Sequence, residues 1–181
     1  MIPVWKSLLG KKYQLNVTFK WAKICELAKV YIDKKNLSIS IAMRHLDCGS
    51  CGGCEAELAA AFDPPYLADR FGLYIVASPK EADILGVTGA YSNHMALAAE
   101  RTYELMPEGK HSSRQIALIG DCALGDGPFK NAPECDKEKF DRIWDKVEPI
   151  PIKGCPPSPA EIITKIIKGL KKTEQVNYGK R

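Results

Sequence analysis

The sequence predicts an α/β fold, a flavodoxin-like open parallel sheet with helices on both faces, preceded by an N-terminal amphipathic arm. From Leu37 onward, apolar runs with strand character alternate with segments of helical periodicity. Three of these runs lead directly into loops that contain both glycine and cysteine. The chain has 181 residues, of which 45% are hydrophobic, and this is enough for one such domain with an appendage or two.

Three regions are expected along the chain. Residues 1–36 are a basic amphipathic arm in which tryptophan and leucine are interleaved with lysine. Residues 37–172 form the α/β domain, and residues 173–181 are a basic C-terminal tail. No apolar run approaches the roughly 18–20 residues that a membrane span needs, and the N-terminus lacks the apolar region of a signal peptide. We therefore expect an intracellular protein whose seven cysteines are reduced.

The charge is unevenly distributed. Residues 1–36 contain eight lysines and two acidic residues, a net charge of +6. Residues 165–181 contain six basic residues and one acidic residue, a net charge of +5, so the body of the chain is acidic. Basic ends favour an acidic protein partner or an anionic membrane surface. Nucleic acid is not expected as a partner, because no basic stripe with stacking aromatic residues lies near the cysteines.

The first half of the domain is expected to contain three strands and one helix. Residues 37–46 alternate apolar and polar side chains, which is typical of a half-buried strand. Residues 55–62 are rich in alanine and indicate a short helix. Residues 74–77 and 84–88 are short apolar runs that predict two further strands.

In the second half, Ser92 is expected to cap a helix that ends near Met106. Residues 115–119 are an apolar run that predicts a strand, and residues 136–147 predict a helix.

The last two elements surround a third cysteine loop. Residues 149–152 predict a short extended segment. The sequence Ser158-Pro159-Ala160-Glu161 is a capping box with proline at the first helical position. It opens a final helix that we expect to end near Lys172.

Three cysteines, Cys48, Cys51 and Cys54, stand at three-residue spacing in a glycine-rich stretch. Thiolates at this spacing can reach the same ion or cluster, and glycine lets backbone N–H groups turn toward anionic sulfur. The stretch is therefore predicted to bind a metal.

Two more cysteines follow predicted strands. Cys122 comes after residues 115–119, and Cys155 comes after residues 149–152. Ligands of open parallel sheets bind beyond the carboxyl ends of the strands. We therefore expect three separate segments to bring thiols to one edge of the sheet.

The cysteine pattern distinguishes between metals. Zinc is the weaker interpretation, because no second C-x-x-C or histidine pair follows Cys54. A self-contained ferredoxin loop is excluded, because Leu58 stands where that motif needs a cysteine and proline. A four-iron cluster held by two loop thiols together with Cys122 and Cys155 satisfies the ligand count.

Several motifs carry a resemblance to a known family: Cys51-Gly-Gly-Cys54-Glu55, Gly120-Asp-Cys122, Gly154-Cys155-Pro-Pro, Phe71-Gly72, Ser78-Pro79-Lys80-Glu81-Ala82-Asp83-Ile84-Leu85 and Thr88-Gly89. From about Ile39 to Leu170 the chain resembles the small subunit of nickel–iron hydrogenases and its homologue in respiratory complex I. The last three motifs are similar to the membrane-bound, complex I-related hydrogenase branch, which includes relatives that reduce sulfur compounds. The resemblance implies one 4Fe-4S cluster with four ligands: Cys51, Cys54, Cys122 and Cys155.

The resemblance also implies a role and partners. The chain would be an electron-transfer subunit of an oxidoreductase complex and not catalytic alone. Electrons would come from a ferredoxin-like subunit with two 4Fe-4S clusters and pass to a hydrogenase-like large subunit. Membrane-arm subunits would hold the complex, with this chain peripheral on the cytoplasmic side of the membrane. The substrate of the whole complex would be protons and hydrogen or a sulfur compound such as polysulfide.

Two alternatives remain open at this point: a subunit of a quinone-reducing NADH dehydrogenase, and a metal-binding scaffold without a redox role. The chain ends soon after the helix that follows Cys155, so we expect one cluster, as in the membrane-bound branch. Residues 90–94 and 123–127 differ from the hydrogenase pattern. We expect both segments at the cluster edge, where the differences favour a substrate other than hydrogen.

The remaining cysteines, two histidines and Glu55 are not expected to bind the cluster directly. Three cysteines are expected to be unligated: Cys25, Cys48 and Cys135. Cys48 is expected to be a polar loop thiol packed beside the cluster. His45 and His94 are candidates for hydrogen bonds to sulfide, although each is more often a structural histidine. Glu55 is a candidate proton relay, or alternatively a first-turn acid favoured by the helix dipole.

Overall fold

The computed structural model describes residues 40–108, 114–144 and 147–178. Within these residues, five strands form one parallel sheet in the order β2-β1-β3-β4-β5. This is the flavodoxin-like strand order, so the predicted fold class is confirmed. The strands are β1 (Ile41–Asp47), β2 (Leu73–Ile75), β3 (Ile84–Thr88), β4 (Gln115–Ile119) and β5 (Ile150–Ile152).

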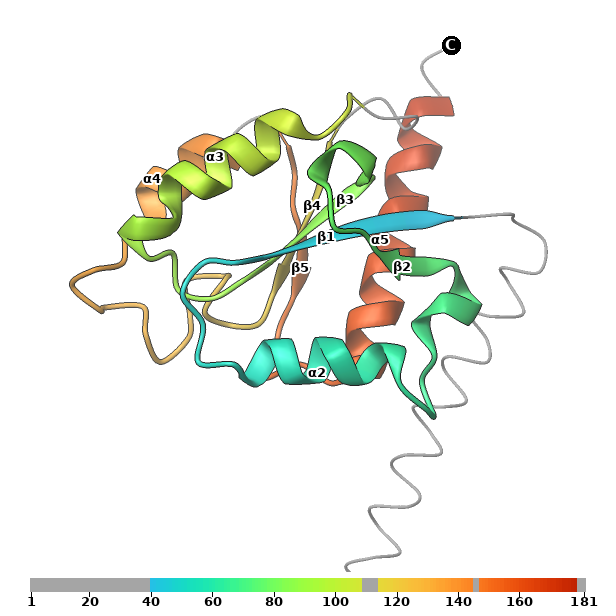
Figure 1. The fold of residues 1–181 in the computed structure, drawn as a ribbon, viewed down its shortest axis with the longest axis horizontal. Coiled ribbons are helices and arrows are strands. Elements are labelled where there is room, and N and C mark those ends of the chain that lie inside the picture. Colours follow the sequence, from blue (N-terminus) through green and yellow to red (C-terminus); the bar gives the residue numbers. More distant parts are fainter. Residues whose placement is uncertain (1–39, 109–113, 145–146, 179–181) are drawn as a thin grey trace, which may run out of the picture. The chain divides into compact units, whose positions relative to one another are not determined.

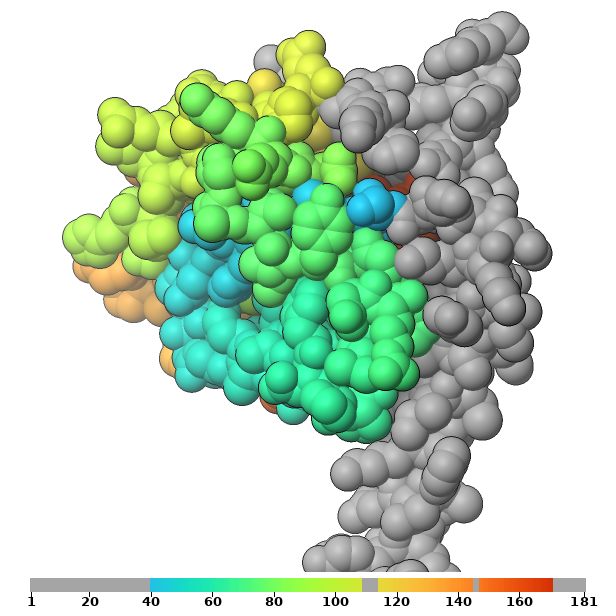
Figure 2. Space-filling model, turned by 45° about the vertical axis from the view of Figure 1, so that its right-hand side comes forward, coloured from blue at the N-terminus to red at the C-terminus, as the bar shows by residue number. Residues whose placement is uncertain are grey.

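Helices cover both faces of the sheet (Figure 1). They are α2 (Gly53–Phe62), α3 (Ala96–Leu105), α4 (Lys137–Trp144) and α5 (Pro159–Tyr178), with short 3-10 turns η2 (Ala68–Phe71), η3 (Pro79–Glu81) and η4 (Asn93–Met95). Helices α3 and α4 pack together on one face, and α2 packs with α5 on the other. Figure 2 shows α2 and the segment from η2 to β2 side by side on one surface.

Two helix ends differ from expectation. Ser92 makes no side-chain capping bond; its backbone N–H donates instead to the Cys48 carbonyl oxygen at 2.8 Å. Helix α5 continues past Lys172 to Tyr178. The Ser158 capping box is present, because the Glu161 carboxylate accepts hydrogen bonds from the Ser158 N–H at 3.0 Å and the Ser158 hydroxyl at 2.6 Å.

The core alternates between the two faces of the sheet. On β3, Leu85 and Val87 are buried in a cluster with Tyr103 of α3 and with Phe140 and Trp144 of α4. Aromatic side chains therefore fill the α3/α4 face.

On the α2/α5 face, four isoleucines of α5 are buried beneath the sheet: Ile162, Ile163, Ile166 and Ile167. Gly86 of β3 lies on this face, where an added Cβ would come 3.0 Å from the Met43 sulfur and 3.3 Å from Ile119 Cδ1. Close packing on both faces fixes the strand register and hence the positions of the loops that follow the strands.

The predicted arm, residues 1–36, and Cys25 lie outside the described residues, as does the end of the predicted tail. The region boundaries at residues 36 and 172 therefore stay predictions. Among the described helices, none is both long enough and apolar enough to cross a membrane.

Candidate metal centre

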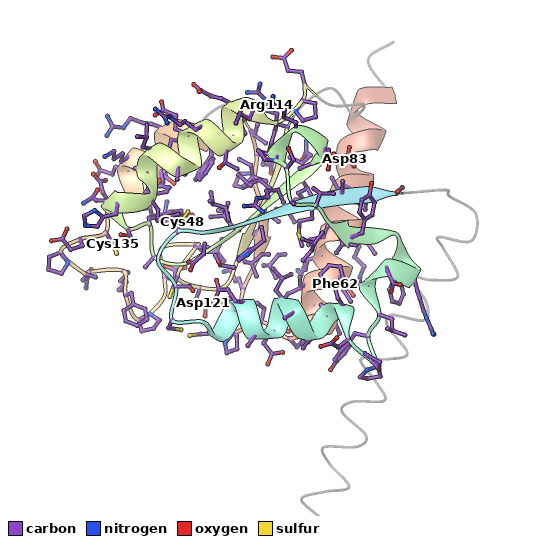
Figure 3. All side chains as sticks on the ribbon, in the orientation of Figure 1. Cys48, Phe62, Asp83, Arg114, Asp121 and Cys135 are labelled. Atoms are coloured by element: carbon purple, nitrogen blue, oxygen red, sulfur yellow. The ribbon has the colours of Figure 1, made fainter. Side chains whose placement is uncertain are left out.

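Three loops with cysteine meet at the carboxyl edge of the sheet. Cys51 and Cys54 lie in and after the loop that follows β1, Cys122 follows β4, and Cys155 follows β5. In Figure 3 the labelled Asp121 lies beside the start of α2, at the end of the sheet opposite Asp83. The predicted convergence of three chain segments at one edge is therefore present.

Hydrogen bonds within the first loop set its shape. The Asp47 carboxylate accepts from the N–H groups of Gly49 at 2.9 Å and Ser50 at 2.8 Å. The Ser50 hydroxyl accepts from the Gly52 N–H at 3.1 Å. Gly49 and Gly52 have positive φ angles of 93° and 84°, which residues with a side chain rarely adopt. The turn presents Cys51 at the surface.

Glycines lie beside three of the four thiols. An added Cβ at Gly120 would overlap the Cys54 sulfur, and one at Gly127 would overlap the Cys122 sulfur. An added Cβ at Gly53 would lie 3.6 Å from the Cys51 sulfur and 3.9 Å from Cβ of Pro156, the residue after Cys155. Glycine is needed at Gly120 and Gly127 because a sulfur atom lies against the backbone there, whereas the contacts at Gly53 would be ordinary ones.

The loops after β4 and β5 are bonded to each other. The Gly120 N–H donates to the Ile152 carbonyl oxygen at 2.8 Å, and the Asp121 N–H donates to the Gly154 carbonyl oxygen at 2.9 Å. The Asp121 carboxylate accepts from the Gly154 N–H at 2.8 Å. Asp121 therefore holds together the two loops that carry Cys122 and Cys155.

The electrostatics of the thiols reflect their mutual proximity. Burial, the Glu55 charge and the neighbouring Cys122, Cys51 and Cys155 raise the pKa of the Cys54 thiol to about 12. Burial also raises the pKa of Cys122. A hydrogen bond from the Phe129 backbone opposes this rise, and the Cys155, Cys51 and Asp121 charges add to it. Four thiolates without a counter-charge repel one another, so binding of metal relieves repulsion and releases protons.

Cys48 lies apart from these thiols. Its side chain is 0% exposed and belongs to the apolar cluster under α3 and α4, with Leu46 and Tyr91 among its members. Burial and the Asp47 charge, with no contribution from another cysteine, raise its pKa to about 12. The expectation of a polar thiol beside the cluster is wrong in this respect, because Cys48 is a core residue.

A partly buried polar group lies under the first loop, on the α2/α5 face of the sheet. His45 Nε2 is 3.0 Å from the Thr88 hydroxyl oxygen and 3.7 Å from a Glu55 carboxylate oxygen. Burial raises the pKa of Glu55, but the nearby Thr88 and Ser50 hydroxyls and the charge of His45 outweigh it, so the net shift is downward. The sequence pointed to His45 and Glu55, whereas Thr88 was noted only within the Thr88-Gly89 motif and not as a partner of either.

The structure gives no contact with the four thiols for the remaining described residues that the sequence singled out. His94 is exposed and Cys135 is half-buried in an isolated bridge with Ser92. Residues 90–94, expected at the cluster edge, begin inside the core, because Ala90 and Tyr91 are only 6% and 1% exposed. Only part of this segment is therefore exposed at the surface.

The four thiols fit an iron–sulfur cluster by donor type and by the glycine-lined space around them. Within the described ranges, no three or more His, Cys, Asp or Glu side chains are grouped so that they could hold one metal ion. The thiolates of a four-iron cluster bind four different iron atoms and are spaced by the cluster itself.

Fold and site place the chain among α/β proteins with a flavodoxin-like sheet and cysteine-containing loops at its carboxyl edge. The family described as "NADH ubiquinone oxidoreductase, 20 Kd subunit" matches residues 51–169, which include Cys51, Cys54, Cys122 and Cys155. The chain belongs to this family, and the resemblance predicted from its motifs is confirmed.

Two curated relatives illustrate the range of the family. The chain is 35% identical over 142 residues to the probable membrane-bound hydrogenase subunit mbhJ of Pyrococcus furiosus, covering 75% of this chain and 77% of that one. It is 37% identical over 130 residues to NAD(P)H-quinone oxidoreductase subunit K of Picosynechococcus sp., covering 71% of this chain but 50% of that one.

Among solved structures, the chain is similar to one from the membrane-bound sulfane sulfur reductase, an archaeal respiratory membrane complex. The TM-score is 0.60 at 23% identity, with 83% of this chain and 77% of that chain covered. At this identity the likeness supports the fold alone.

Proposed function

We propose that this chain is the electron-transfer subunit of a membrane-bound oxidoreductase complex and holds a single 4Fe-4S cluster through Cys51, Cys54, Cys122 and Cys155. The observation that carries the proposal is the meeting of four thiols from three loops at one edge of the sheet. Family membership adds support, because iron–sulfur binding is a property of this family.

The four-cysteine ligand set suits this chain to electron transfer rather than to catalysis. A four-iron cluster with four cysteine ligands has no open coordination site and supplies one-electron transfer. The residues of this chain hold the thiols in place: Asp47 shapes the first loop, and Asp121 ties the loops after β4 and β5. Catalysis then belongs to another subunit.

The exposure of the thiols supports a partner at this edge. Cys51 and Cys155 are exposed, whereas Cys54 and Cys122 are half-buried. A cluster held here would reach the surface of the isolated chain, so a partner must cover it to keep electron-transfer gaps short. We assign this place to a hydrogenase-like large subunit, with electrons arriving from a ferredoxin-like subunit that carries two 4Fe-4S clusters.

The terminal acceptor is proposed to be protons, with hydrogen as product, or a sulfur compound such as polysulfide. The hydrogenase name of the Pyrococcus relative favours the first. The burial of Tyr91 and of Ala123, which is 0% exposed, weakens the sequence argument against hydrogen, because these altered residues do not face an acceptor. The quinone oxidoreductase relative favours quinone as the alternative.

The test is a redox titration of the complex, with iron and acid-labile sulfide measured on this chain after the subunits are separated without air. We expect about four irons and four sulfides per chain, together with one reversible one-electron signal. A chain that binds metal without reversible reduction would favour the scaffold alternative and contradict the electron-transfer role.

Residues 1–35 are proposed to attach the chain to membrane-arm subunits or to an anionic bilayer on the cytoplasmic side. Support comes from the interleaving of tryptophan and leucine with eight lysines, which couples apolar burial to electrostatic attraction. Deletion of these residues should leave the cluster signal unchanged and release the chain from membranes. A truncated chain that still sediments with the membrane complex would contradict this attachment.

A further inference from the structure

Tyr91 has an unusual backbone for its residue type. Its φ angle is 65°, in the left-handed region, although it carries a large side chain. It is also 1% exposed, and its ring centroid lies 4.9 Å from that of Phe140. A left-handed conformation is unfavourable for residues with a Cβ and persists where surrounding contacts require it. We therefore ask which contacts hold Tyr91 in this conformation and what they connect.

The side chain of Tyr91 reaches the second cysteine loop. Its hydroxyl donates a hydrogen bond to the carbonyl oxygen of Ala123, the residue directly after Cys122. Ala123 is fully buried, so no solvent can replace this bond if it is lost. The bond thereby fixes the backbone directly after Cys122.

The backbone around Tyr91 reaches the first cysteine loop. The N–H groups of the residues on either side of Tyr91 donate to Gly49 and Cys48 carbonyl oxygens at 3.1 and 2.8 Å. The Tyr91 carbonyl oxygen accepts from the Asp136 N–H at 3.0 Å, at the far end of the loop that begins with Cys122. The segment from Ala90 to Ser92, with Tyr91 at its centre, thus connects the loop of Cys51 and Cys54 with the loop of Cys122.

We propose that Tyr91 is a positioning residue for the metal centre, and that its hydroxyl holds Cys122 at the correct separation from the thiols of the first loop. This inference rests on the proposed function. The hydroxyl of Tyr91 bonds to the backbone of Ala123, so it acts on Cys122 through that backbone. Its removal should loosen one ligand while the fold and the other three ligands remain.

The test compares Tyr91→Phe with Tyr103→Phe in the intact complex, purified without air. Both changes remove one hydroxyl from the same aromatic core, but the ring of Tyr103 packs edge-on against Trp144 and lies beneath Arg114. Iron loss to a chelator should be about tenfold faster in Tyr91→Phe than in the wild type, the effect of losing a buried hydrogen bond. Tyr103→Phe should match the wild type.

The reduced-state spin resonance spectrum and the midpoint potential provide a readout that general destabilisation does not move. Both should change in Tyr91→Phe and stay unchanged in Tyr103→Phe, even if the two variants lose similar thermal stability. Equal iron loss and equal spectra in the two variants would overturn the inference. Failure of Tyr91→Phe to fold, while Tyr103→Phe folds, would also overturn it, because the hydroxyl would then serve the fold.

The proposed function fails in a different way. If the wild-type complex carries no cluster on this chain, the electron-transfer role is wrong regardless of either variant. If the wild type carries the cluster and Tyr91→Phe behaves like it, only the role of Tyr91 is wrong.

Discussion

The first cysteine loop has two halves with opposite environments. At its start, Cys48 is 0% exposed and lies among apolar side chains of the core. Three and six residues later in the sequence, Cys51 is exposed and Cys54 is half-buried beside other thiols. Equal spacing along the chain therefore produces one core residue and two candidate ligands.

The backbone explains the difference. The Cys48 N–H donates to the Thr88 carbonyl oxygen at 2.8 Å, which extends the pairing of β1 with β3 by one step. Alternation along a strand then turns Cys48 to the same face as Leu46. After Cys48, the left-handed glycines Gly49 and Gly52 turn the chain away from the sheet. The end of the strand thus separates the first cysteine of the C-x-x-C-x-x-C run, which is in the core, from the other two, which are at the site.

The largest expected effect is the difference between replacing Cys54 and replacing Cys48 in the first cysteine loop. Cys54→Ser should abolish or convert the cluster, because it removes a proposed ligand from the half-buried side of the site. Cys48→Ser should keep a full cluster but lower the free energy of unfolding by about 1–3 kcal/mol, because it buries a hydroxyl in an apolar core. Iron and sulfide content, the reduced-state signal and thermal unfolding measure both effects.

The opposite pattern would change the ligand set. A normal cluster in Cys54→Ser together with cluster loss in Cys48→Ser would move the first-loop ligands toward Cys48. A normal four-iron signal in Cys122→Ser or Cys155→Ser would show that the three loops do not all bind one cluster.

A second prediction concerns the space around the thiols. Gly120→Ala and Gly52→Ala both place a Cβ at a positive φ, 95° and 84°, so the backbone strain of about 1–2 kcal/mol is shared. The added Cβ at Gly120 overlaps the Cys54 sulfur, whereas the one at Gly52 meets nothing within 4 Å. Cluster occupancy should therefore fall severalfold in Gly120→Ala and change little in Gly52→Ala. Equal occupancy in the two variants would show that the overlap is relieved elsewhere.

A third, smaller effect tests the charge around Cys54. The Glu55 charge helps to raise the pKa of the Cys54 thiol, which must lose its proton to bind iron. Glu55→Gln should ease cluster assembly, and the advantage should persist from pH 6.5 to 9, because the thiol pKa of about 12 lies above this whole range. Glu57→Gln provides the control on the same helix. Cluster yield at limiting iron and sulfide, measured from pH 6.5 to 9, checks the prediction; identical profiles for both variants would contradict it.

Much of the fold could be predicted because its signals are local. The apolar runs at residues 84–88 and 115–119 match β3 and β4 residue for residue, and the Ser158 capping box opens α5. The parallel sheet followed from the alternation of strands and helices, since parallel neighbours need crossover helices.

The site was predicted less completely, because part of it depends on contacts between distant residues. Placement after strands indicated Cys122, Cys155 and two unspecified thiols of the first loop, and the family resemblance implied which two. The burial of Cys48 depends on its pairing with Thr88, and the hydroxyl of Tyr91 meets a carbonyl 32 positions away. Neither contact has a signature in the neighbouring sequence. Ser92 was expected to cap a helix, but its backbone is used to hold the first loop.

The smallest expected effect compares the two faces of β1 at this edge. One face carries the apolar Cys48, and the other carries His45, which bonds to Thr88 near Glu55. Burial lowers the pKa of His45 below its ordinary value of 6.5; the Glu55 and Asp47 charges oppose this shift, and the Arg44 charge adds to it. The unfolded chain therefore binds this proton more readily than the folded chain.

The sign of the pH dependence follows. Above pH 6.5 the imidazole is neutral in both states, and its contribution to stability is fully present. As the pH falls through 6.5 toward the lower folded pKa, the unfolded state gains protons first, so stability is lost. The melting temperature of the cluster-loaded chain should fall between pH 7.5 and 5.5, and fall less in His45→Gln. His94→Gln, which changes an exposed histidine, should follow the wild type. If His45→Gln loses as much stability over this range as the wild type, the polar face of β1 has no role in the pH response, and the contrast with Cys48 is one of packing alone.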